Sequence, residues 1–157
     1  RVPAFIHFAG IKRQGEVSDT FISVKDVMPT LLDFAGTAHP GERYKGRDVA
    51  PIQGKSMYSF LSGETDQVHD GDYVMGWEIF SNLAIQQGDW KITQRPVNPM
   101  AQSDSKVEWE LYNIKNDPSE QTDLAVAEPG KLKELILHWE QYAKDNRIIL
   151  PEWKISE

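Results

Sequence analysis

The segment Asn82-Leu-Ala-Ile-Gln-Gln-Gly-Asp-Trp-Lys-Ile-Thr-Gln94 contains two alternating stretches around Gly88-Asp89. A two-residue turn of this composition predicts a β-hairpin. In the register that the turn sets, Gln87 pairs with Trp90. One face then carries the large apolar side chains, Leu83, Ile85, Trp90 and Ile92, and the other carries Ala84, Gln86, Lys91 and Thr93. The segment therefore predicts an antiparallel sheet with one apolar face.

The sequence around the hairpin predicts partners for that face. Residues 72–79 and the alternating Val107, Trp109 and Leu111 predict two further strands. Asp117-Pro-Ser-Glu120 has the form of a capping box, which predicts a short helical turn. An apolar stripe predicts a helix over about 130–145, made of Leu132, Leu135, Ile136, Trp139, Tyr142 and Ala143. The helix and the sheet are expected to pack together.

The first half of the chain has a different pattern. Residues 2–9 are apolar and predict a buried strand, and residues 16–23 a second one. The apolar spacing over 24–35 predicts a helix that ends at Gly36. Residues 37–55 are expected to form a long loop and 56–61 at most a short helix. The polar stretch 63–71 marks a domain boundary, which gives domains 1–71 and 72–157 of α/β (α+β) class.

Composition excludes several classes of function. The chain has 157 residues, 24 acidic and 17 basic, with a formal charge of −7. That balance argues against a nucleic-acid binder, and no apolar run reaches the length of a membrane span. Without cysteine there is no thiol nucleophile, zinc thiolate or disulfide. The chain begins at Arg1 with no leader pattern, and we expect it to be cut from a longer protein.

The residues give no catalytic constellation. No serine lies in a Gly-x-Ser-x-Gly elbow, and Gly54-Lys55-Ser56 lacks the first glycine of a phosphate-binding loop. The histidines lie at positions 7, 39, 69 and 138, without metal-ligand spacing. We interpret His7 as a core histidine and His138 as solvated, whereas His39 is a candidate for lining a cleft. Asp70-Gly-Asp72 is too short for a calcium loop.

Trp77-Glu78 is a candidate pocket rim, because an aromatic ring beside an acid stands at a strand end. An ordinary edge-strand pair explains it equally well. Glu108 and Glu110 are expected to form a solvated face of their strand.

The motifs, taken in order, resemble the C-terminal part of an arylsulfatase-type sulfatase of the alkaline phosphatase superfamily. The resemblance rests on Arg1-Val-Pro3, on Asp26-Val-Met-Pro-Thr-Leu-Leu-Asp33 with Ala35-Gly36, on Gly88-Asp-Trp-Lys91, and on Leu111-Tyr112 followed by Asn116-Asp-Pro-Ser-Glu120. Asn113 stands where the family usually has aspartate, and Leu83 and Gln86 where it often has arginine. These departures put in doubt any contact of those arginines with an anionic substrate.

The resemblance implies hydrolysis of sulfate esters by a formylglycine that is made from Cys or Ser in a Cys/Ser-x-Pro-x-Arg motif, with a calcium ion polarising the sulfate. This sequence contains no such motif, and in the family the calcium ligands precede the segment matched by Arg1. Catalytic and metal-binding residues are therefore expected upstream, with Trp77, Glu78 and His39 as a substrate-side rim. A periplasmic or secreted location is weakly implied.

Two alternatives stay open at this point. The first is a non-catalytic module that binds carbohydrate or another partner, in which exposed tryptophans stack on sugars. The second is a phosphoesterase or phosphonate hydrolase of the same superfamily. In each case the apolar residues 2–9 must be buried against other structure. A chain that lacks this structure must expose these residues, dimerise or lose order over 1–62.

Overall fold

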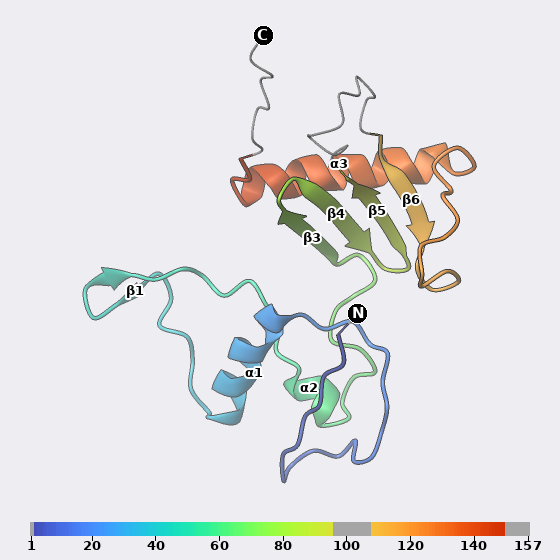
Figure 1. The fold of residues 1–157 in the computed structure, drawn as a ribbon. Coiled ribbons are helices and arrows are strands. Elements are labelled where there is room, and N and C mark those ends of the chain that lie inside the picture. Colours follow the sequence, from blue (N-terminus) through green and yellow to red (C-terminus); the bar gives the residue numbers. More distant parts are fainter. Residues whose placement is uncertain (1, 96–107, 150–157) are drawn as a thin grey trace. The chain divides into compact units, whose positions relative to one another are not determined.

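The computed structural model describes residues 2–95 and 108–149 (Figure 1). The chain divides into two compact units, Arg1–Asp70 and Gly71–Glu157, which are described in turn. Within the described ranges, no helix is both long enough and apolar enough to cross a bilayer.

The second unit is built on a four-stranded antiparallel sheet. Its strands follow one another in chain order: β3 (Val74–Ile79), β4 (Asn82–Gln87), β5 (Trp90–Gln94) and β6 (Glu110–Asn113). Gln87 pairs with Trp90 and Ile85 with Ile92, as the Gly88-Asp89 turn predicts. Gly88 takes a positive φ of 55°, a backbone conformation that glycine adopts without steric cost.

Helix α3 (Pro129–Asp145) covers one face of this sheet, as expected from its apolar stripe (Figure 1). The buried core between them consists of Leu83, Ile85, Ile92, Leu111, Leu135 and Trp139. Gly76 lets the helix approach β3, because a Cβ at this position would lie 2.5 Å from the Tyr142 ring. The predicted small sheet packed on a long C-terminal helix is thereby confirmed.

One local prediction in this unit is wrong, and one predicted strand is shorter than expected. Asp117–Glu120 forms a turn and not a capped helix, because the Asp117 carboxylate accepts hydrogen bonds from the backbone of Gln121 and Thr122, at 2.7 and 2.8 Å. Glu120 has a positive φ of 53°, and its carboxylate binds Lys91 Nζ at 2.6 Å and so does not reach back to the cap. The last strand begins at Glu110; Val107, included in the predicted strand, lies outside the described residues.

In the first unit the predicted helix is confirmed. A 3-10 turn, η1 (Val24–Asp26), leads into α1 (Val27–Phe34), and Gly36 follows with a φ of 60°. The loop over 37–55 contains a two-residue ladder, β1 (Arg43–Tyr44) with β2 (Arg47–Asp48). The short helix α2 covers Tyr58–Leu61.

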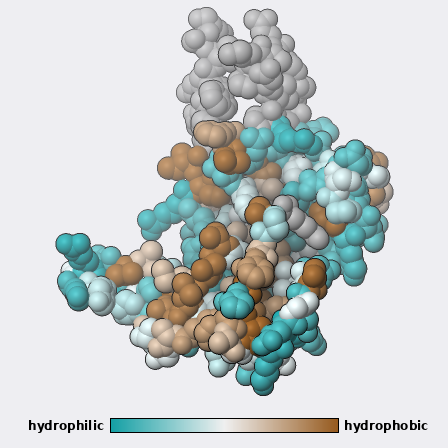
Figure 2. Space-filling view, turned by 60° about the horizontal axis from the view of Figure 1, so that its bottom comes forward, coloured by the Kyte–Doolittle hydropathy of each residue, from teal (hydrophilic) through white to brown (hydrophobic). Residues whose placement is uncertain are grey.

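The strands predicted over 2–9 and 16–23 do not form. The structure assigns no strand to residues 2–23, and Val2 and Phe5 are each 90% exposed. His7 is exposed as well, so its interpretation as a core histidine is wrong. Figure 2 shows apolar side chains at the surface. A strand with two apolar faces needs neighbouring strands for its hydrogen bonds, and this part of the chain pairs with none.

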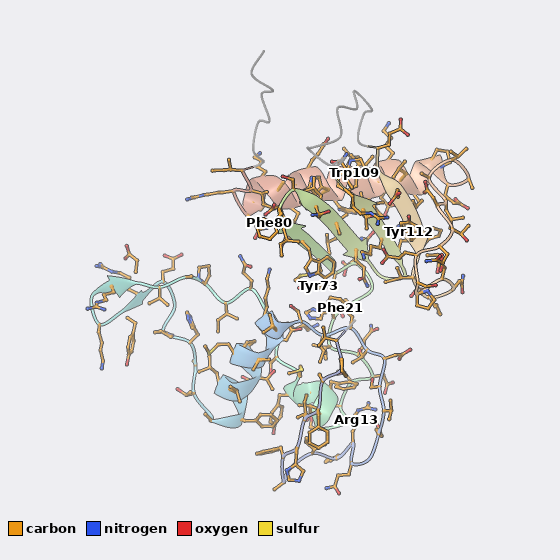
Figure 3. The ribbon with its side chains drawn as sticks, in the orientation of Figure 1. Arg13, Phe21, Tyr73, Phe80, Trp109 and Tyr112 are labelled. Carbon is orange, nitrogen blue, oxygen red and sulfur yellow. The ribbon has the colours of Figure 1, made fainter. Side chains whose placement is uncertain are left out.

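A small apolar cluster replaces the expected sheet. It consists of Ile11, Met57, Phe60, Leu61 and Val68. Arg13 ties the chain around it together: its guanidinium donates to the carbonyls of Phe60 at 2.8 Å and Thr65 at 2.9 Å (Figure 3). Hydrogen bonds to the Glu16 and Asp66 carboxylates raise the pKa of Arg13.

Candidate functional site

The face of the sheet opposite α3 is the candidate site, and we call it the open face. Strand register and side-chain alternation define its two rows. One row crosses Met75, Gln86, Lys91 and Tyr112, and the other crosses Trp77, Ala84, Thr93 and Glu110. The first strand contributes apolar side chains and the last two contribute polar ones. Met75, Thr93 and Tyr112 on this face are buried, whereas Trp77 and Glu110 are partly exposed.

The polar end of the open face is organised by Glu110. Its carboxylate accepts hydrogen bonds from Arg95 at 2.9 Å and from Thr93 Oγ1 at 3.2 Å. The hydrogen bond from Arg95 lowers the pKa of Glu110, so the carboxylate is charged at neutral pH. Burial and the neighbouring Glu110 raise the pKa of Tyr112, which keeps that phenol protonated. These groups can donate and accept hydrogen bonds, but none is an activated nucleophile.

Trp77 and Glu78 do not converge on one pocket. Successive residues of β3 alternate between faces, so Trp77 belongs to the open face whereas Glu78 shares the helix side with Leu83. The Trp77 side chain is 38% exposed. The Glu78 carboxylate accepts a hydrogen bond from the Ser81 amide at 2.9 Å, which makes it part of the β3–β4 turn. A role of either residue in substrate binding stays a prediction.

The turn beside Trp77 holds an exposed aromatic ring. Phe80 and Ser81 have positive φ values of 50° and 64°, where asparagine and glycine are usual. The Asn82 side chain donates to the carbonyl of Ile79 at 3.0 Å and stabilises this conformation. Phe80 is consequently held 88% exposed (Figure 3).

His39, the third predicted rim residue, belongs to the first unit. It lies in the loop after α1, is half-buried, and accepts a hydrogen bond from the Gly41 amide through Nδ1 at 3.2 Å. Neither unit by itself contains all three predicted rim residues, and the role of His39 also stays a prediction.

The residues that the structure describes do not form a formylglycine and calcium centre. Across residues 2–95 and 108–149, no three His, Asp or Glu side chains lie together as a possible metal site, and the sequence has no cysteine. Gly54 of the Gly-Lys-Ser segment is required by packing, because a Cβ there would lie 2.0 Å from the Lys25 carbonyl oxygen. This explains the glycine without a bound phosphate.

Sequence reasoning missed a buried polar centre around Asp26. The carboxylate of Asp26 is fully buried and lies 2.8 Å from Nε2 of His69. It also accepts hydrogen bonds from the amides of Ser23 at 2.7 Å and Lys55 at 2.9 Å. The spacing Ser23-x-x-Asp26 is a capping-box signal that was visible in the sequence. The pairing with His69, 43 residues away, had no local signal.

Comparison with known protein families gives a match over residues 1–141 to the family described as N-sulphoglucosamine sulphohydrolase, C-terminal. An uncharacterised sulfatase of Schizosaccharomyces pombe is 35% identical over 150 residues, which are 95% of this chain and 26% of the relative. An N-acetylglucosamine-6-O-sulfatase of Bacteroides thetaiotaomicron is 26% identical over 154 residues, covering 93% and 26%. The chain thus spans about a quarter of the length of these relatives.

Solved structures share the fold. The structure of a 2-O GAG sulfatase matches 88% of this chain and 28% of its own chain, with a TM-score of 0.60 and 24% identity. A second structure, which contains its substrate D-glucosamine-2-N,6-O-disulfate, matches 82% of this chain and 25% of its own, with a TM-score of 0.53 and 24% identity.

Proposed function

Because the chain belongs to the N-sulphoglucosamine sulphohydrolase C-terminal family, we propose that it is the non-catalytic C-terminal part of a sulfuric ester hydrolase. The observation that carries the proposal is the family match over 141 residues of a sequence without a Cys/Ser-x-Pro-x-Arg motif. The relatives are sulfatases, which favours this function over a separate binding module and over a phosphoesterase.

Under this proposal, formylglycine and calcium belong to the part of the enzyme upstream of Arg1. There, the formylglycine residue would supply the nucleophile, and bound calcium would act as the Lewis acid that polarises the sulfate. The residues that the structure describes contain no group of three possible metal ligands. The catalytic chemistry is therefore separate from the fold described above.

The contribution of this chain is to support the fold and to form a rim on the substrate side. Trp77 supplies a partly exposed aromatic surface, suited to stacking on a sugar ring. On the same face of the sheet, Glu110 supplies a partly exposed carboxylate that Thr93 and Arg95 hold in place. A sulfated sugar is the substrate class that we propose, and it is supported by the N-acetylglucosamine-6-O-sulfatase among the relatives.

The test compares this chain with a longer gene product that includes the upstream segment. Hydrolysis of an aryl sulfate and calorimetric titration with calcium are measured on both proteins. The 157-residue chain is expected to show neither turnover nor micromolar calcium binding, and the longer protein both. Turnover or micromolar calcium binding by the chain alone would contradict the proposal, as would an inactive, correctly matured longer protein.

The proposed rim is tested in the longer protein with Trp77→Ala. Loss of a contact made equally in the ground and transition states raises KM for a sulfated sugar while kcat is unchanged. Val126→Ala is the matched control, because Val126 is 94% exposed and lies outside the sheet. Equal KM values for the two variants would remove Trp77 from the rim.

A further inference from the structure

The buried carboxylate of Asp26 connects three segments that are distant in the sequence. It is bound by the amide of Ser23 just before η1, by the amide of Lys55 in the loop before α2, and by His69 next to the boundary between the units. His69 itself is only 7% exposed, and its ring meets Phe21 edge-on at 5.9 Å. A carboxylate removed from water needs all of these donors, because burial of a charge is costly without them.

Thr30 of α1, four residues after Asp26, adds a second connection. Its hydroxyl donates to the carbonyl of Asp26 at 2.6 Å and accepts a hydrogen bond from the Met57 amide at 2.9 Å. Lys55 and Met57 are therefore both bound through their backbones to the start of α1. Gly54, just before Lys55, also lies against the Lys25 carbonyl, so this segment packs closely on the residues that precede α1.

We propose that Asp26 and His69 act as a clasp that holds residues 54–69, here called the strap, closed on the start of α1. The strap contains α2 and contributes most residues of the apolar cluster of the first unit: Met57, Phe60, Leu61 and Val68. His69 fixes one end of the strap and Lys55 the other, whereas Arg13 holds its middle through the carbonyls of Phe60 and Thr65. Loss of the clasp therefore lowers the free energy needed to open the strap as one unit. The exposed ion pair between Lys55 and Asp70, at 3.1 Å, adds little to this closure.

The clasp also fixes the place where the chain leaves the first unit. His69 is followed by Asp70, the last residue of that unit. With the clasp closed, the path of the backbone at this point is set by a buried contact, whereas the next residues up to β3 form a turn. An open strap would lengthen the connection between the two units by its own residues.

Amide hydrogen exchange on the 157-residue chain, read by NMR, tests the clasp. In His69→Ala the amides of Lys55 and Met57 keep their acceptors, Asp26 Oδ1 and Thr30 Oγ1, so faster exchange of these two amides alone would report only a local change at the clasp. The informative amides are those of Leu61, Ser62 and Glu64, whose hydrogen-bond partners all lie within the strap. We expect them to exchange at least about tenfold faster, a change of ~1.4 kcal/mol in opening free energy, while β4 and β5 keep their protection.

His39→Ala is the matched control, because His39 lies in the same unit and accepts a local hydrogen bond from Gly41; it should leave the strap unchanged. His69→Gln keeps a side-chain N–H donor and should give an intermediate effect even if His69→Ala unfolds the first unit. The proposal would be overturned if His69→Ala caused no faster exchange, or faster exchange at Lys55 and Met57 only. It would also be overturned if His69→Gln reduced the protection of α1 as much as that of the strap.

Discussion

At the scale of single residues, Trp139 shows how one side chain joins a helix to a sheet. It is 6% exposed and lies in the core with Ile85 and Leu135. Its ring centroid is 5.8 Å from that of Trp109, at an interplanar angle of 58°, and 6.1 Å from that of Tyr142. Aromatic rings at these distances contribute beyond the area that they bury.

Replacement of Trp139 by Ala is therefore expected to lower the free energy of unfolding of the second unit by about 3–5 kcal/mol. Urea denaturation followed by far-UV circular dichroism measures the change. Leu137→Ala is the control on the same helix, since Leu137 is 56% exposed, and it should cost less than about 1 kcal/mol. Equal midpoints for the two variants would contradict the packing.

At the scale of elements, the ladder between β5 and β6 carries a pH-sensitive contact on the open face. Glu110 accepts from Arg95 and Thr93, and Arg95 lowers the pKa of its carboxyl. In the unfolded chain the carboxyl titrates near its ordinary value of about 4.3. In moderately acidic solution the unfolded state then binds more protons than the folded state, so the contribution of Glu110 is present above that value and is lost as pH falls through the folded pKa.

Glu110→Gln should consequently flatten the loss of stability between about pH 5 and pH 3. The effect is small, because the pair is largely exposed to solvent. Thermal unfolding midpoints measured over this pH range give the comparison. Glu140→Gln, at an exposed position of α3, is the control and should retain the acid dependence of the unmodified chain. A Glu110→Gln profile parallel to that of the unmodified chain would refute this role.

At the scale of the whole molecule, the two units differ in how they are stabilised. The second has a sheet and a helix that bury a common core. The first has short elements, exposed apolar residues over 2–8 and the small cluster around Phe60. Regions with few buried contacts open at lower free energy. The assignment of residues 1–71 to the end of a larger catalytic domain remains a prediction.

Limited proteolysis in dilute solution is expected to cut first between residues 1 and 71, leaving a resistant fragment that begins near Asp72. Mass spectrometry of a time course identifies the fragments, and size-exclusion chromatography shows whether dimerisation covers the apolar residues. A uniformly resistant monomer, with residues 2–9 as protected from hydrogen exchange as the β4–β5 hairpin, would contradict this boundary.

Local patterns determined the hairpin register, the helix before Gly36 and the apolar stripe of α3. Each depends on spacing along a few residues: the Gly88-Asp89 turn sets the pairing of Ile85 with Ile92, and a 3.6-residue period sets which side of α3 is buried. The sulfatase resemblance came from the order of such short motifs, and the family match confirms it.

Tertiary structure alone decided the rest. Residues 2–9 have the composition of a buried strand but form none, because a strand exists only where other backbone segments pair with it. The Asp117 turn is set by its own carboxylate and by the salt bridge of Glu120 with Lys91, 29 residues away. Asp26 and His69 meet across 43 residues, and no local periodicity encodes a contact between side chains so far apart in the chain.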